Sequence, residues 1–167
     1  MKFTISSDEE LKRIADCLSE NGVACEVFQD DDETCIITEQ QMEGSEVTRH
    51  FTIRVSFGEM IVRAHNLVSC VPADDREEIM RICNRLNRQY RHAKFYMTPE
   101  DCVDAEYVLM ICEPENNAAE LARQMYGSFF KAVSVAYSEL TVALSELENL
   151  EDDLIIRDGD EDRKSVV

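Results

Sequence analysis

This sequence of 167 residues contains few glycines and prolines, no tryptophan and no long uncharged apolar run. Its five glycines form neither a G-x-G-x-x-G pattern nor a P-loop, so no loop of the kind that cradles phosphates is expected. A membrane-spanning helix would need roughly 18 consecutive apolar residues, and no such stretch occurs. The first ten residues lack the apolar core of a secretory signal. These absences predict a soluble, cytoplasmic protein.

Basic residues are also scarce, with 17 Lys and Arg against 35 Asp and Glu and a net charge of −18. Binding to nucleic acid or to an anionic membrane requires cationic clusters, so both partners are excluded and basic protein partners are favoured. Residues 146–167 alone hold nine acids and three bases. We therefore predict one domain over residues 1–148 and an acidic, mobile C-terminal tail over residues 149–167.

The spacing of the cysteines and of the acidic residues matches neither a disulfide pair nor a metal-binding motif. The seven cysteines are odd in number, are spread along the chain and never occur as C-x-x-C, which predicts reduced, mostly buried thiols. The acidic stretches at 30–33 and 158–162 lack the spacing of an EF-hand loop, and a turn and a solvated tail explain them. We expect no metal, no cofactor and no disulfide.

The three histidines do not form a recognisable catalytic motif. His50, His65 and His92 have no G-x-S-x-G, H-E-x-x-H or Cys/His signature near them in the sequence. Structural or solvent-exposed roles account for all three, and we predict that the protein is not an enzyme. The alternative is a small enzyme or small-molecule sensor whose site lies on an exposed face of the sheet.

The periodicity of apolar residues predicts an α+β protein with an antiparallel sheet flanked by helices. A first helix begins at the cap Ser6-Ser7 and ends at Asn21-Gly22. The later elements are strands over 24–29, 34–39, 51–57 and 60–68, a helix over 74–91, strands over 94–98 and 102–112, and a long helix from Asn117 to about Leu147. The predicted order is α-β-β-β-β-α-β-β-α.

The helix over 74–91 is the candidate surface for a dimer or a partner. Its apolar residues occupy more than one side, whereas a helix that only covers a core needs a single stripe. Six of the 17 bases fall between residues 76 and 94. A solvated helix face explains these bases equally well, and contact with an acidic partner or with the tail is the functional alternative. The candidate interface residues are Ile79, Met80, Arg81, Ile82, Cys83 and Arg85.

Residues 84–111 read NRLNRQYRHAKFYMTPEDCVDAEYVLMI, and this text resembles the YbjN family. In that family a helix ends in an N-x-L-N type segment, and the next strand begins near a K-F pair. The matching positions here are Asn84, Leu86, Asn87, Lys94 and Phe95, and Gly22-Val23 and the acidic turn at 30–33 agree upstream. The likeness covers about residues 3–145.

The resemblance implies a bacterial protein with the fold of class I type III secretion chaperones. It also implies frequent homodimerisation and a non-enzymatic role in binding other proteins, and many family members are labelled sensory transduction regulators. It brings no catalytic residues. We therefore expect a chaperone-like module or regulatory adaptor that binds a segment of a partner protein.

Overall fold

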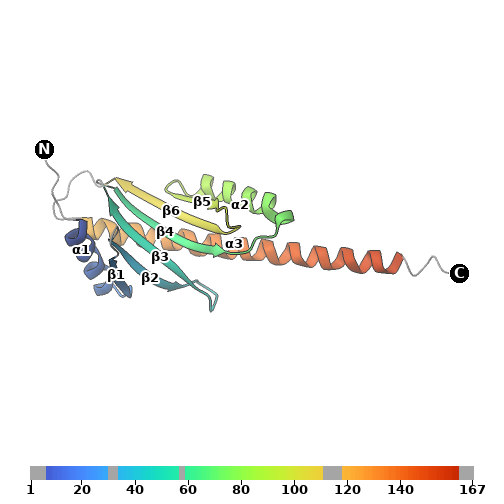
Figure 1. The fold of residues 1–167 in the computed structure, drawn as a ribbon, viewed down its shortest axis with the longest axis horizontal. Helices are drawn as coiled ribbons and strands as arrows, with labels where there is room; N and C mark the ends of the chain where they lie inside the picture. The colour runs from blue at the N-terminus through green and yellow to red at the C-terminus, as the bar shows by residue number, and fades with distance from the viewer. Residues whose placement is uncertain (1–6, 30–33, 57–58, 111–117, 162–167) are drawn as a thin grey trace.

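The computed structural model describes the backbone of residues 7–29, 34–56, 59–110 and 118–161, and their side chains from residue 8 to residue 148 apart from Ser56. The predicted α+β order is confirmed (Figure 1). The elements are α1 (Ser7–Glu20), β1 (Cys25–Gln29), β2 (Thr34–Gln41), β3 (Thr48–Ser56), β4 (Glu59–Val68), a 3-10 turn η1 (Ala73–Asp75), α2 (Arg76–Gln89), β5 (Ala93–Met97), β6 (Val103–Met110) and α3 (Ala118–Glu161).

The six strands form one antiparallel sheet in the order β1-β2-β3-β4-β6-β5. Each of the first four strands pairs with its neighbour in sequence. After β4 the chain forms α2 and returns as β5, and β6 then inserts between β5 and β4. The sheet therefore has β1 at one edge and β5 at the other, and these two edges lie on opposite sides of the molecule (Figure 1).

One face of the sheet is buried under the three helices. In β3, Phe51 and Ile53 are fully buried, whereas Thr52 between them faces the other side and is half-buried. This alternation is what a period-2 strand produces when only one of its faces is covered. Residues of α1, α2 and α3 join the buried strand residues in a single hydrophobic core. Among the described residues, no helix covers the opposite face, which we call the open face (Figure 1).

Helix α1 forms because its apolar residues recur at helical spacing and its end is well defined. Leu11, Ile14 and Leu18 are fully buried, as the sequence predicts. The helix ends at Glu20, and the turn that follows it contains Gly22, whose φ of +84° lies in the left-handed region that favours glycine. The N–H of the next residue, Val23, donates to the carbonyl of Leu18 at 3.0 Å. This closure directs the chain from α1 straight into β1.

Helix α3 crosses beneath the sheet and projects beyond it (Figure 1). It continues to Glu161, past the end of the apolar stripe that predicts a helix to about Leu147. One residue of that stripe, Leu121, is largely exposed, and the neighbouring Ala122 occupies the buried position instead. The side chains from residue 149 onward lie outside the described residues, so a separate mobile tail over 149–167 stays a prediction.

The aromatic contacts of Phe51 yield a prediction about stability. Phe51 is fully buried, and its ring centroid lies 5.8 Å from that of Tyr126 and 6.2 Å from that of Phe129, both edge-on. Phe51→Ala should lower the free energy of unfolding by about 3–5 kcal/mol, because it leaves a cavity where β3 meets α3. Urea titration monitored by circular dichroism measures this loss.

The matched control is Phe28→Ala, which removes the same side chain from a position in β1 that is 51% exposed. It should cost roughly 1 kcal/mol or less. Equal losses in the two variants would contradict the assignment of β3 as the centre of the core.

Candidate binding surfaces

The β5 edge of the sheet is closed by a side chain from α2. Asn87 Nδ2 donates to the carbonyl of Phe95 at 3.0 Å, and the N–H of Phe95 donates to Asn87 Oδ1 at 2.7 Å. One amide side chain therefore makes the pair of hydrogen bonds that a neighbouring strand would make. Edge strands are commonly protected by covering elements of this kind. No further strand can pair with β5 at Phe95 unless Asn87 moves away.

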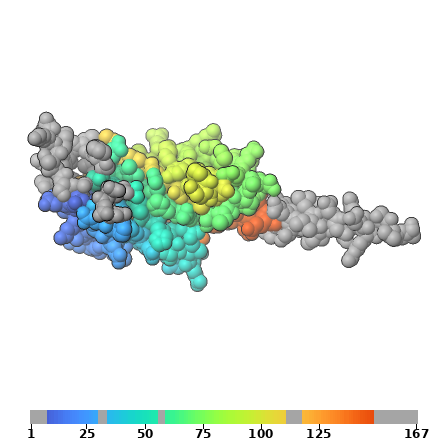
Figure 2. Space-filling model, viewed as in Figure 1, coloured from blue at the N-terminus to red at the C-terminus, as the bar shows by residue number. Residues whose placement is uncertain are grey.

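The β1 edge lacks a comparable cover among the described residues. Every residue of β1 from Glu26 to Gln29 is exposed, and Val27 and Phe28 are 46% and 51% exposed. The strand contains no proline and no lysine, two residue types that proteins use to protect such edges. Figure 2 shows the blue surface of α1 and β1 at one end of the molecule, away from the green surface of α2.

Contacts with α1 and β2 position β1 in the sheet. The Cys25 thiol lies 3.4 Å from the carbonyl of Ala15 in α1, and the Thr38 hydroxyl donates to the carbonyl of Ala24 at 2.7 Å. All five β1 residues pair in register with β2. The strand is thus anchored at its start and paired with β2 along its length, and alternation places its two exposed apolar side chains on opposite faces of the sheet.

The structure separates the six candidate interface residues of α2 into two groups. Ile79, Ile82 and Cys83 are buried in the core of the protomer, and burial raises the pKa of Cys83 to about 11. These three residues cannot reach a partner. Met80 is 51% exposed, and Arg81 and Arg85 are largely exposed as well. The extra apolar side of the helix consists of Met80 alone, because the other three belong to the stripe that faces the sheet.

The two candidate arginines have partners within the protomer. Arg81 forms ion pairs with Glu77 and Glu78 one turn earlier in α2, and Arg85 Nη2 lies 2.7 Å from Glu139 Oε2 of α3. A hollow of about 490 Å³ lies between the two helices beside these pairs, with Val142 on its α3 side. The arginines therefore do not depend on the acidic tail for a partner.

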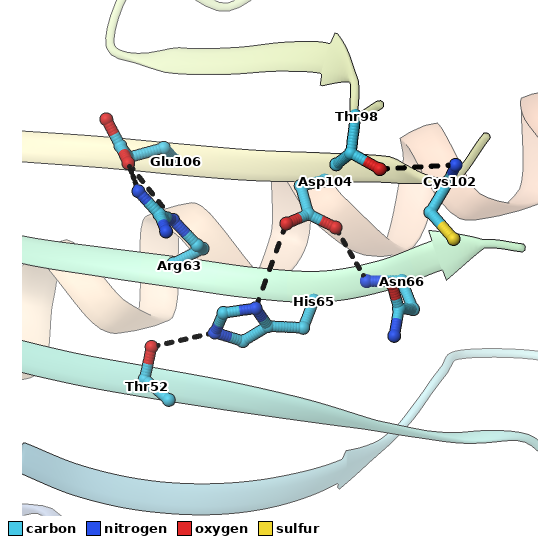
Figure 3. A network of polar contacts seen from close by, with 8 residues as sticks. All are labelled: Thr52, Arg63, His65, Asn66, Thr98, Cys102, Asp104 and Glu106. Atoms are coloured by element: carbon cyan, nitrogen blue, oxygen red, sulfur yellow. Dashed lines mark hydrogen bonds and ion pairs between the residues drawn. The ribbon is translucent and has the colours of Figure 1, made fainter. Parts of the chain in front are cut away.

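The open face carries a polar network that spans three strands (Figure 3). Thr52 Oγ1 of β3 and His65 Nε2 of β4 share a hydrogen bond of 2.9 Å, and His65 Nδ1 lies 3.7 Å from Asp104 Oδ2 of β6. One register step away, Arg63 Nε donates to Glu106 Oε2 at 3.1 Å, and this hydrogen bond raises the pKa of Arg63.

A hydroxyl, an imidazole and a carboxylate in this order resemble a catalytic triad. Here, however, the carboxylate forms its hydrogen bond with a backbone N–H and not with the imidazole. The distance from His65 to Asp104 is too long for a hydrogen bond. The other oxygen of Asp104 accepts the N–H of Asn66 at 2.8 Å, and Asn66 has a φ of +50° within the register shift between Ala64 and Val68. Asp104 thus fixes an irregularity in β4.

The other two histidines, His50 and His92, are exposed. His50 Nδ1 lies 3.1 Å from Glu39 Oε1 on the exposed surface, and the ring of His92 packs edge-on against Tyr107. Within the described ranges, no group of three His, Cys, Asp or Glu residues is arranged to hold a metal ion, and no helix is long and apolar enough to cross a membrane. The acidic stretches at 30–33 and 158–162 lie outside the described side chains.

Sequence reasoning misses the two edges and the histidine network. The sequence singles out Asn87 only as part of the segment that resembles the YbjN family. No neighbouring residue indicates that its side-chain amide bonds the backbone of Phe95. His65 is taken as isolated, since Thr52 and Asp104 come from other strands. Strand alternation over 60–68 is the signal that could have placed Arg63 and His65 on the polar face.

Comparisons with known proteins agree with this fold. A family model named YbjN, with the description "Putative bacterial sensory transduction regulator", matches residues 10–129. A similar solved structure is the "Crystal structure of YbjN, a putative transcription regulator from E. coli", which is 10% identical. The match covers 79% of this chain and 91% of that chain with a TM-score of 0.57, and at this identity it shows the fold alone. No curated protein matches the chain.

The environment of His65 predicts a pH dependence of stability. Burial lowers the pKa of His65 below its usual 6.5, nearby Arg63, Arg54 and His50 act in the same direction, and Asp104 opposes the shift. The unfolded state therefore takes up a proton more readily than the folded state. The free energy of unfolding should fall as the pH drops from about 7 to about 5.5, and His65→Gln should reduce this fall.

Urea titrations at several pH values measure the slope for each variant. The control is His92→Gln, which removes an exposed imidazole that is not among the groups acting on the pKa of His65 and should keep the slope of the wild type. An unchanged slope in His65→Gln would show that another group is responsible.

Proposed function

The chain belongs to the YbjN family, and from this premise we propose that it acts without chemistry, by binding an extended segment of a partner protein at the β1 edge. The segment would add to the sheet as a seventh strand. The observation that carries this proposal is the difference between the two edges: Asn87 closes β5, whereas Val27 and Phe28 stand exposed on β1. The family description of a regulator fits a protein that works by holding another protein.

Strand addition supplies affinity from the backbone and selectivity from side chains. Val27 and Phe28 lie on opposite faces, so a strand added beside β1 would cover both with its own alternating residues. Full burial of one such side chain contributes roughly 1.5–3 kcal/mol. The contacts of β1 with α1 and β2 fix the edge in advance, which lowers the entropic cost of binding.

The rival function is a ligand or catalytic site on the open face. The hollows at the β2–β3 turn and between α2 and α3 lie away from His65. Asp104 is engaged with the backbone of Asn66, and Arg63 with Glu106. These arrangements favour a binding role over chemistry. The free thiols of the described cysteines are consistent with a location in the cytoplasm, which we include in the proposal.

A differential capture experiment tests the edge. The double variant Val27→Thr/Phe28→Ser keeps the net charge and the strand propensity at Val27 but removes most of the exposed apolar surface of β1. Proteins captured from native lysate by the wild type should be reduced at least tenfold with this variant, as the loss of about one buried side chain predicts. Quantitative mass spectrometry measures the difference and maps the bound segment.

The matched control is Val135→Gln, which removes a comparably exposed apolar side chain from α3. It should capture the same proteins as the wild type. If Val27→Thr/Phe28→Ser captures the same proteins in the same amounts as the wild type, binding occurs elsewhere and the proposal is wrong.

We further propose that two copies associate through α2. The family resemblance implies homodimerisation, and the apolar pattern of this helix suggests it as the contact surface. Met80 is the exposed apolar residue of this helix, and Arg81 and Arg85 flank it. An isologous contact about a two-fold axis would bring Met80 of each copy to the centre and let the arginines meet acidic groups of the partner. The three buried residues Ile79, Ile82 and Cys83 would support this surface from within.

Light scattering tests the dimer. Met80→Glu should give a folded monomer, because it places a carboxylate at the centre of an apolar contact, and circular dichroism verifies the fold. Val135→Glu alters a comparably exposed residue of α3 and serves as the control. A wild type that already scatters as a monomer at tens of micromolar would contradict this dimer.

A further inference from the structure

The basic residues of this protein are unevenly distributed between the two edges of its sheet. Residues 14–48, which form the second half of α1 and all of β1 and β2, contain no Lys, Arg or His, and the first half of α1 carries Lys12 and Arg13. The same segment contains ten acids: Asp16, Glu20, Glu26, Asp30, Asp31, Asp32, Glu33, Glu39, Glu43 and Glu46. Six of the 17 bases, in contrast, lie between residues 76 and 94, in α2, the turn after it and the start of β5 at the opposite edge.

The distance between the edges prevents the arginines of α2 from neutralising the acids beside β1. Six strands with a spacing of about 4.8 Å separate the two edges by roughly 24 Å. Screening in physiological salt reduces charge interactions beyond about 8 Å, so each edge presents its own charge to solvent. Near β1, the described acids Asp16, Glu20 and Glu26 are all exposed. The β1 edge is therefore apolar at Val27 and Phe28 and anionic around them.

We propose that the segment which adds to β1 is cationic, with basic residues alternating with apolar ones. This inference rests on the proposed function and names the chemistry of the partner. The apolar residues of such a strand would cover Val27 or Phe28, and its basic residues would lie beside Glu20 and Glu26. Two further consequences follow: binding weakens as salt rises, and the encounter is accelerated by charge attraction.

A second copy of this chain is a poor occupant of the same edge. Two β1 strands paired antiparallel would bring two base-free segments of ten acids each together, and the like charges would repel. The basic surface of a second copy is the helix α2, which has no strand backbone to offer to an edge. The occupant is accordingly a segment of a different protein.

Synthetic peptides test the charge of the segment. Three strand-forming peptides that alternate valine with lysine, with serine or with glutamate are titrated against the full chain, and fluorescence anisotropy reports binding. The valine–lysine peptide should bind most tightly and lose affinity from low to physiological salt. The double variant Glu20→Lys/Glu26→Lys should weaken it about tenfold, because two attractions become repulsions.

The matched control is Glu146→Lys/Glu148→Lys, which makes the same change in net charge in α3, where Glu146 borders the hollow beside α2. It should leave the affinity for the valine–lysine peptide unchanged within about twofold, since α2 packs on β5 at the edge of the sheet opposite to β1. The double variant Val27→Thr/Phe28→Ser should weaken the same peptide in both salt conditions, which locates the peptide on β1.

The outcomes separate this inference from the proposed function. If all three peptides bind equally and all lose affinity in Val27→Thr/Phe28→Ser, the edge binds strands without regard to charge, and only the cationic partner is wrong. If both charge-reversal variants weaken the lysine peptide equally, the attraction belongs to the whole chain and the inference also fails. If the affinity of the valine–lysine peptide is the same for the wild type and for both β1-edge variants, the proposed edge site is wrong as well.

Discussion

The rest of this structure depends on the burial of one face of a six-stranded sheet beneath three helices. Because α1, α2 and α3 all contribute to the same core, the other face of every central strand must carry side chains that tolerate water. Phe51 and Ile53 of β3 lie on the covered side, and Thr52 lies on the open side with His65 and Arg63. The open sheet also has two edges, β1 and β5, and these differ in how they are covered.

The two edges differ in hydrogen bonding and in charge. At β5, the amide of Asn87 occupies the backbone positions of Phe95 that another strand would use. At β1, nothing comparable lies over Val27 and Phe28 within the described part of the chain, and the surrounding segment has no basic residue. Acidic repulsion is itself a means of keeping such an edge from pairing with its own copy. The same acids that limit self-association would then attract a basic strand.

The polar network of the open face is a structural device. Asp104 accepts the N–H of Asn66, and this bond holds the register shift in β4 in place. His65 joins this network to Thr52 of β3, so that the irregular strand is tied to both of its neighbours. Burial lowers the pKa of the His65 imidazole in this position, and a lowered pKa in the folded state links stability to pH.

The sequence by itself determines the number, order and type of the elements. Period-2 alternation in β3 and β4, the helical stripe Leu11, Ile14 and Leu18, and the turn at Gly22 are all encoded by residues close in sequence. The excess of acids and the concentration of bases in α2 are visible in the same way. These features depend on local backbone geometry, so a reading of neighbouring residues is sufficient to predict them.

Only the tertiary structure decides which strands are neighbours, and with this which residues become accessible. The insertion of β6 between β4 and β5 brings Asp104 to His65 and places β1 and β5 at the edges. The packing of α2 on the sheet buries Ile79, Ile82 and Cys83 and leaves Met80 outside, although all four are apolar residues of one helix. Periodicity describes one element at a time and carries no information about pairing between distant segments. The position of an edge, and of any site on it, is therefore fixed by the non-local packing of the whole chain.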